Sequence, residues 1–237
     1  MSDFPKAILI DLDDTIIDDT GCVEACWADA CVQAATRLDG LESRALRDAI
    51  REQADWFWSD PTRHRDGRLG LRAATRQIVE RAFRHIGRID IALAHATSDH
   101  YRALRDERMC LIPSALGALD TLRAAGVRLG LMTNGTGSTQ RDKIKRFGLA
   151  PYFQHMVIEG EFGVGKPDRR VFETLLRELN VGPAGAWAIG DNLEFDVLAP
   201  MRLGLHGIWV DAAGKGCDGR PDQPDRIVSA LSDLVAR

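Results

Sequence analysis

The sequence predicts an α/β protein, a doubly wound Rossmann-like parallel sheet with an all-helical domain inserted after its first strand. Three observations support this prediction. The unbroken apolar run "KAILID" at residues 6–11 suits a strand that is buried on both faces. From Pro113 onward, short apolar strands alternate with helical patterns, which is typical of βαβ units. Between these two parts Gly and Pro are sparse, and apolar residues recur at helical spacing.

Composition and charge narrow the class of protein. A length of 237 residues favours one large domain, or one domain with an insert. The net charge of -4 argues against nucleic acid as a partner. Five cysteines, an odd number, and the lack of an apolar leader before the first strand favour a reducing, cytoplasmic location. No apolar run approaches the roughly 20 residues of a membrane span. The oligomeric state stays open.

The inserted segment is expected to form about four amphipathic helices. Leu71, Ala74 and Ile78 illustrate the spacing of its apolar stripes. The expected helices span residues 20–37, 42–58, 69–86 and 90–109, with "PTRHRDGRLG" as a loop between the second and the third. Residues 18–109 are therefore predicted to form the helical domain, and residues 1–17 and 110–237 the α/β core.

After the insertion, strands and helices are expected to alternate to the end of the chain. The strands are "VRLGLMTN", "HMVIEG", "AWAIGD" and "HGIWVD". The helices span residues 114–125, 139–147, 169–179, 195–203 and 226–235. With the first strand, these strands would form one parallel sheet.

Polar side chains stand where the predicted strands end. Asp11 and Asp13 follow the first strand, and Asp191 follows "AWAIG", with Asp196 one turn into the next helix. The other polar groups at strand ends are Thr133, Asn134, Gly135 and Lys166. The carboxyl ends of parallel strands meet at one crevice, so we expect these groups to lie together. For the first acidic cluster alone, an ordinary turn is the competing interpretation, because Asp side chains bond the local backbone.

A cluster of carboxylates at this crevice predicts a bound cation. Carboxylates within about 4 Å of one another would otherwise repel by several kcal/mol per pair. No His or Cys accompanies them, so the ligand oxygens favour a hard ion. Mg²⁺ is the expected ion, because it binds through few carboxylates together with substrate phosphate.

Beside such an ion, these residues suit phosphoryl transfer. A carboxylate such as Asp11 can attack phosphorus and form an aspartyl-phosphate. Asp13 shares the parity of Asp11 along the extended chain, and it can protonate a leaving oxygen and later activate water. The Thr133 hydroxyl, the amides around Asn134 and the Lys166 ammonium can stabilise the phosphoryl oxygens. The expected phosphate-binding residues are Thr133, Asn134, Gly135 and Lys166.

Four motifs in this order resemble those of the haloacid dehalogenase superfamily of hydrolases. "DLDDT" from Asp11 to Thr15 matches its first motif, DxDx[TV], and "MTNG" its second, with Thr133. "GVGKPD" supplies the lysine of the third motif, Lys166, and "IGDNLEFD" resembles the fourth, with Asp191 and Asp196. The resemblance covers the whole chain, since a helical insert between motifs one and two is what this family calls a C1 cap.

The resemblance implies a phosphatase that acts on a small phosphorylated metabolite. By it, Asp11 is the nucleophile and Asp13 the general acid/base. Asp11, Asp191 and the Asp13 carbonyl would bind Mg²⁺, and Asp196 would support the shell of the metal. A helical cap could close over a small substrate and exclude water.

Several alternatives are weighed against the phosphatase. The dehalogenases of the family lack an acid/base Asp two residues after the nucleophile, so Asp13 argues against dehalogenation. Phosphonate-cleaving relatives use a cap lysine, yet no lysine occurs between Lys6 and Lys143. A phosphomutase that uses the same aspartyl-phosphate stays open. A phospho-accepting signalling domain is the non-enzyme alternative, but such receivers carry the acceptor on a middle strand and need neither Asp13 nor a cap.

The charge of the insert offers the one indication of substrate. Residues 37–108 contain fifteen Arg, no Lys and twelve Asp and Glu, which predicts a basic lid for an anionic ligand. An ordinary solvated arginine face is the competing interpretation. The residues proposed to contact the non-phosphate end of the substrate are Arg63, His64, Arg65, Arg68 and Arg72.

Overall fold

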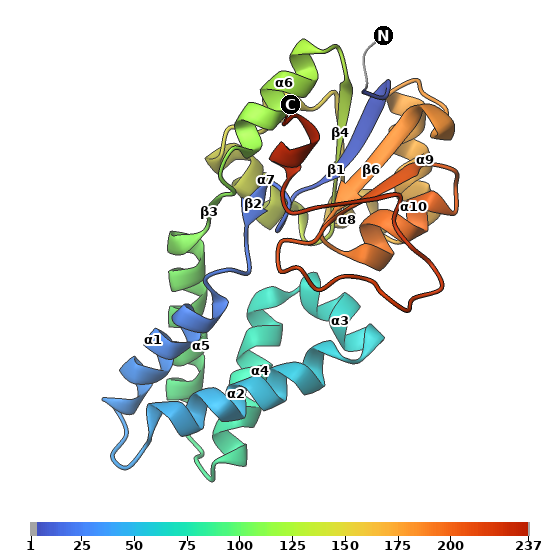
Figure 1. Ribbon diagram of the computed structural model, residues 1–237. Coiled ribbons are helices and arrows are strands. Elements are labelled where there is room, and N and C mark those ends of the chain that lie inside the picture. The colour runs from blue at the N-terminus through green and yellow to red at the C-terminus, as the bar shows by residue number, and fades with distance from the viewer. Residues whose placement is uncertain (1–3, 237) are drawn as a thin grey trace. The chain divides into compact units, whose positions relative to one another are not determined.

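The computed structural model describes residues 4–236, which divide into two compact units (Figure 1). The α/β unit joins the chain up to Asp18 to the chain from Cys110 onward, and the helical unit spans Asp19–Met109. No helix among the described residues combines the length and the apolar composition that crossing a bilayer requires.

The α/β unit is built on a six-stranded, wholly parallel sheet with the order β5-β4-β1-β6-β7-β8. Its strands are β1 (Ala7–Asp11), β4 (Arg128–Thr133), β5 (His155–Ile158), β6 (Ala186–Gly190), β7 (His206–Val210) and β8 (Arg226–Val228). All five residues of β1 are buried between β4 and β6, as its unbroken apolar run predicts. The predicted α/β class is confirmed.

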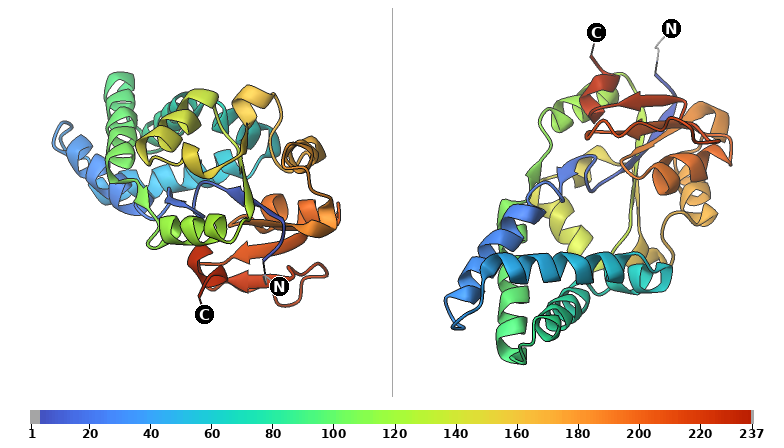
Figure 2. Two further views of the ribbon diagram at one scale, coloured as in Figure 1. Left: turned by 90° about the horizontal axis from the view of Figure 1, so that it is seen from above. Right: turned by 60° about the horizontal axis from the view of Figure 1, so that its bottom comes forward.

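Helices cover both faces of this sheet (Figures 1 and 2). One face carries α6 (Ala115–Ala124) and α7 (Gly137–Arg146), and the other carries α9 (Arg169–Glu178) and α10 (Ala199–Met201). On the α9 side, Leu9 and Met132 share a buried cluster with Phe172 and Leu175. Short helical turns complete the unit: η1 (Ala150–Tyr152), α8 (Glu159–Phe162), η2 (Pro183–Gly185), η3 (Leu193–Leu198) and η4 (Leu231–Leu234).

A two-stranded antiparallel ribbon stands where the chain leaves and re-enters the α/β unit. It pairs β2 (Ile17–Asp18) with β3 (Cys110–Leu111), so that Ile17 lies opposite Leu111. Strands of two residues have no recognisable alternation, and the sequence therefore did not predict this ribbon.

The helical unit contains α1 (Val23–Ala35), α2 (Ser43–Trp58), α3 (Pro61–Arg68), α4 (Leu71–His85) and α5 (Ile91–Arg108). The four long helices lie where the apolar spacing places them, and Figure 2 shows them packed together. Leu46, Ile50, Ile78 and Phe83 are among the residues of its buried core.

The prediction that "PTRHRDGRLG" forms a loop is wrong, because most of this segment forms α3. Asp60 is its N-cap and accepts a hydrogen bond from Arg63 N at 2.8 Å, and Pro61 occupies the first turn. Gly67 weakens the helical pattern in the sequence. In the structure it lets α3 approach α2, since a Cβ there would lie 2.6 Å from Phe57.

The prediction of a helix at residues 226–235 is also wrong. Arg226–Val228 is strand β8, paired in parallel with β7, and only the turn Leu231–Leu234 is helical. Ile227 and Val228 are β-branched and suit an edge strand, but a run this short does not separate strand from helix by periodicity.

Candidate active site

The register of the sheet brings the predicted site residues to one edge. Asp11, the last residue of β1, is paired with Met132 of β4, so Thr133 follows directly beside it. On the other side Ile10 is paired with Ile189 of β6, and Asp191 comes two residues later. Because β1 lies between β4 and β6, Asp11 lies between Thr133 of the second motif and Asp191 of the fourth. The convergence of parallel strand ends predicts this grouping.

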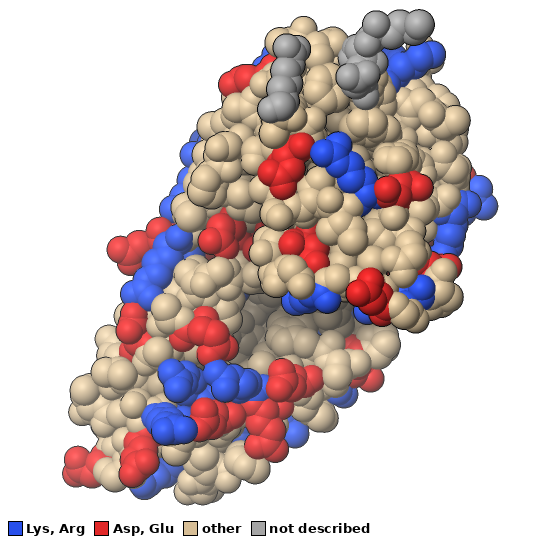
Figure 3. Space-filling model, viewed as in Figure 1, with Lys and Arg blue, Asp and Glu red and all other residues tan. Residues whose placement is uncertain are grey.

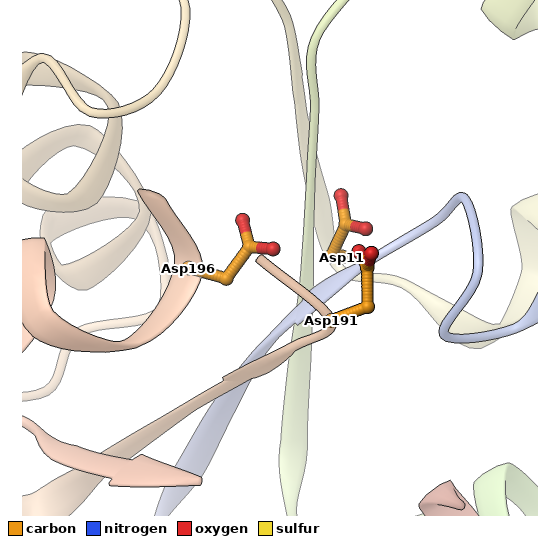
Figure 4. A group of neighbouring side chains, drawn as sticks. All are labelled: Asp11, Asp191 and Asp196. Atoms are coloured by element: carbon orange, nitrogen blue, oxygen red, sulfur yellow. The ribbon is translucent and has the colours of Figure 1, made fainter. Parts of the chain in front are cut away.

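Three carboxylates form a cluster at this edge (Figure 4). One oxygen each from Asp11, Asp191 and Asp196 lies within 4.8 Å of the others. Asp11 comes from β1, Asp191 from the end of β6, and Asp196 from η3. Asp11 and Asp196 are buried, and Asp191 is partly exposed, so the cluster is accessible from one side.

Lys166 is the ammonium within this cluster. Its Nζ contacts Asp11 Oδ1 directly and lies 2.6 Å from Asp196 Oδ1, and its side chain is only 4% exposed. Burial alone would lower the pKa of Lys166, but the charges of Asp11 and Asp196 outweigh it and raise that pKa. Lys166 therefore stays protonated between two carboxylates.

The single ammonium of Lys166 does not balance the negative charge of the three carboxylates. Burial, opposed by Lys166, raises the pKa of Asp11 well above its usual value, and the neighbouring carboxylates add to this effect. Burial and then Asp196 raise the pKa of Asp191 to about 7. Three oxygen ligands with excess negative charge and no His or Cys among them fit a hard divalent cation.

Close backbone packing holds Asp196 in this cluster. A Cβ on Gly190 would lie 2.5 Å from Asp196 Cγ, so only glycine fits at the end of β6. Asn192 caps the following turn by accepting a hydrogen bond from Phe195 N at 3.0 Å. That turn, η3, is π-helical, a rare geometry that occurs frequently at functional sites.

The second and third motifs are joined by a pair of amide hydrogen bonds. Asn134 Nδ2 donates to Lys166 O at 2.9 Å, and Lys166 N donates to Asn134 Oδ1 at 2.7 Å. Gly135 N donates to Glu159 Oε2 at 2.9 Å. Asn134 and Gly135 thus fix the loop that follows β4, and Asn134 positions the backbone of Lys166.

Two side chains of α7 hold Asp13, and the sequence interpretation missed both. Gln140 Nε2 donates to Asp13 Oδ2 at 2.9 Å and to Thr133 Oγ1 at 2.5 Å. Lys143 Nζ lies 2.7 Å from Asp13 Oδ1, and its side chain is 10% exposed. The i, i+3 spacing of Gln140 and Lys143 on the helix after the second motif was the available signal.

The five residues predicted to contact substrate have partners within the helical unit. Arg63 lies over the Trp56 ring at 3.9 Å and donates to Trp56 O at 2.6 Å. Arg72 donates to Asp99 at 3.1 Å. Four of the five residues, Arg63, His64, Arg65 and Arg68, lie on α3, and Arg72 lies on α4. Their contact with substrate stays a prediction.

The family model of the haloacid dehalogenase-like hydrolases matches residues 5–204 of the chain, which is most of its length. The chain belongs to this family. The phosphoserine phosphatase of Thermus thermophilus is 30% identical over 93% of this chain and 92% of its own length. A glyceraldehyde 3-phosphate phosphatase of Methanopyrus kandleri is 28% identical over 97% of this chain and 98% of its own. This haloacid dehalogenase-like hydrolase is a phosphatase, as its motifs predict.

Solved structures of the family share the fold from end to end. A 2-haloacid dehalogenase of Pseudomonas syringae pv. Tomato has a TM-score of 0.62 at 26% identity, covering 98% of this chain and 97% of that one. The HAD-hydrolase YfnB of Bacillus subtilis has a TM-score of 0.70 at 20% identity, with the same coverage. The second likeness bears on the fold alone.

Proposed function

We propose that this protein is a Mg²⁺-dependent phosphatase that hydrolyses a small phosphate monoester through a phosphorylated Asp11. The observation that carries the proposal is the position of Asp11, buried at the end of β1, in contact with Lys166 and grouped with Asp191 and Asp196. A carboxylate so placed is fixed in orientation and kept from bulk water, which suits a nucleophile.

The oxygen-rich cluster is the proposed metal site. Asp11, Asp191 and the Asp13 carbonyl would hold Mg²⁺, and Asp196 would support them. Bound there, the ion would neutralise charge on the carboxylates and on the phosphate. Lys166, the Thr133 hydroxyl and the backbone amide of Asn134 would bind the phosphoryl oxygens, whereas the Gly135 N–H already donates to Glu159.

The reaction has two steps on the side chains of this chain. An Asp11 oxygen forms a bond to phosphorus while the P–O bond to the leaving alcohol breaks, and Asp13 gives that alcohol oxygen a proton. Asp13 then takes a proton from water as the water oxygen attacks the phosphorus. Inorganic phosphate leaves, and the Asp11 carboxylate is restored.

The relatives support a small substrate. The two matched phosphatases are named for phosphoserine and glyceraldehyde 3-phosphate, which are both small phosphate monoesters. The helical unit is proposed to act as a lid, the C1-type cap of the family. A cytoplasmic location stays a prediction; that all five cysteines are free thiols suits a reducing compartment. Dehalogenation and phosphomutase activity are disfavoured by Asp13 and by the phosphatase relatives, respectively.

Phosphate release from a panel of phosphate monoesters tests this function. The panel includes phosphoserine, glyceraldehyde 3-phosphate, phosphoglycolate, hexose phosphates and nucleoside monophosphates. We expect release with Mg²⁺, a loss of at least about 100-fold with a chelator, and full recovery when Mg²⁺ is restored, because the carboxylates need a counter-ion. Undiminished release in the chelated enzyme would refute the metal site. Isomerised sugar phosphate without free phosphate would indicate the mutase instead.

Replacing Lys143 is expected to impair Asp13 without touching the nucleophile. Lys143→Met removes the ion pair that holds Asp13 Oδ1, and we expect kcat to fall about 10-fold with little change in KM, since misplaced catalytic groups cost rate. The loss should be smaller for p-nitrophenyl phosphate, whose leaving group needs little protonation. Lys145→Met, an exposed lysine on the same helix, is the matched control. An equal loss for both kinds of substrate would exclude a role through Asp13.

A further inference from the structure

The helical unit contains a cavity of its own, apart from the carboxylate cluster. Its volume is about 320 Å³, which reaches the lower end of the range of ligand pockets, about 300 to 1,000 Å³. It lies between α1, α2, α4 and α5, and every residue that lines it belongs to Asp19–Met109. The helical unit alone therefore supplies the whole lining of this cavity.

Part of the cavity lining is flat and apolar. Trp27 and Tyr101 stack with ring centroids 3.5 Å apart and planes inclined by 5°, and both are buried. Trp58, Leu71 and Ile78 also line the cavity. Stacked rings beside aliphatic side chains suit a ligand with a flat, apolar body.

The cavity lining is also rich in arginine. Arg47, Arg51, Arg102 and Arg105 line it, against only two acidic residues, Glu24 and Asp55. The helical unit as a whole does not share this excess, because Asp19–Met109 contains fifteen Arg and fifteen Asp and Glu. On its face seen in Figure 3, basic and acidic side chains are interspersed. The positive charge is thus concentrated in the cavity and is not a property of the whole lid.

The pairing of these arginines leaves one without a partner. Arg51 pairs with Glu24 at 2.5 Å, Arg102 with Asp106 at 3.9 Å, and Arg105 with Asp19 at 2.5 Å. Arg47 makes no hydrogen bond or ion pair with any other residue within 4–236, and its Nε is buried. A buried, unbonded guanidinium N–H costs free energy, which an anion in the cavity would offset.

We propose that this cavity binds a small organic anion, a carboxylate or phosphate carried on a flat apolar body. Arg47 binds the anionic group, and Trp27, Tyr101 and Trp58 hold the body. Such an anion is either the non-phosphate end of the substrate or a separate ligand. The inference goes beyond the proposed phosphatase reaction and does not rest on it, because binding can be measured without turnover.

The five tryptophans allow binding to be located by NMR of the full chain with ¹⁵N-labelled indoles. Trp27 and Trp58 line the cavity, whereas Trp209 Nε1 donates to Asp191 O at 2.8 Å and so reports on the carboxylate cluster. The probes are benzoate, benzamide as its uncharged analogue, and acetate as an anion without a ring. In chelated protein, we expect benzoate to shift the signals of Trp27 and Trp58 saturably and to leave Trp209 unmoved. Benzamide and acetate should bind at least about 10-fold more weakly.

Arg47→Met should weaken benzoate binding at least about 10-fold, because it removes the charged donor while keeping an apolar stem. Arg44→Met is the matched control: it lies one turn earlier on α2, outside the cavity, with its side chain 85% exposed. Unfolding midpoints of both variants verify that they fold. The proposal is overturned if benzoate shifts only Trp209, shifts nothing, or binds Arg47→Met as tightly as the wild type.

Kinetics then identify the source of the anion. If the cavity receives the substrate, Arg47→Met raises KM for carboxylate-bearing phosphate monoesters but not for p-nitrophenyl phosphate. If it receives a separate ligand, benzoate alters the rate without competing with substrate. Because the NMR titration is independent of hydrolysis, failure of the cavity and failure of the phosphatase reaction are distinguishable.

Discussion

Asp11→Asn is expected to lower kcat at least about 10³-fold while leaving the protein folded. The substitution keeps the shape of the side chain but removes the attacking carboxylate, and loss of a covalent nucleophile has effects of this size or larger. Burial raises the pKa of Asp11 above its value in the unfolded chain, so the metal-free protein loses stability as the pH rises from the unfolded pKa to the raised one. A neutral amide lacks this cost, and Lys166 keeps the carboxylate of Asp196 as its partner. In the presence of chelator, Asp11→Asn should therefore unfold at no less denaturant than the wild type.

Covalent labelling separates the nucleophile from its acid/base partner. With p-nitrophenyl phosphate and an acid quench, Asp13→Asn should retain phosphate on Asp11, because water is no longer activated, whereas Asp11→Asn should retain none. Mass spectrometry of the peptide that contains residue 11 is the measurement. If Asp11→Asn keeps more than about a tenth of wild-type activity, or is labelled, the nucleophile is another group.

Much of this site was predictable because Asp11, Thr133 and Asp191 lie at the ends of strands or directly after them. The apolar run of β1 predicted its burial, and the convergence of parallel strand ends predicted that Asp11, Thr133 and Asp191 lie close together. The strand order, which places β1 between β4 and β6, is known only from the structure. Lys166 lies beyond β5. Its place after that predicted strand led us to expect it at the same crevice, and the motif resemblance supported this expectation.

What the sequence did not predict depends on contacts between elements. Gln140 and Lys143 have ordinary positions on an amphipathic helix, and only the packing of α7 brings them to Asp13. The excess arginine of residues 37–108 suggested a basic lid, yet Asp19, Glu24 and Asp29 cancel it when the whole unit is counted. That Arg47 lacks a partner is visible only once every neighbouring carboxylate is placed.

Lys166→Met is expected to destroy activity and, unlike Asp11→Asn, to destabilise the fold. Met matches the length of the lysine stem and leaves the backbone hydrogen bonds to Asn134 in place. It removes the ammonium from two buried carboxylates, and breaking a buried ion pair by deleting one partner costs about 3 to 5 kcal/mol. We expect a loss of about 3 kcal/mol in the chelated protein, measured by urea unfolding, and a fall in kcat of at least about 100-fold.

The double variant Lys166→Met, Asp11→Asn tests whether the loss of stability in Lys166→Met is electrostatic. Adding Asp11→Asn to Lys166→Met removes one of the two carboxylates that the lost ammonium had neutralised, so it should recover part of the stability, on the order of 1 kcal/mol or more. Saturating Mg²⁺ should also stabilise Lys166→Met, because a cation bound to the carboxylates again offsets their repulsion. If Lys166→Met lowered stability and neither change restored any of it, the lost energy would belong to packing. The charge balance proposed for the cluster would then be wrong.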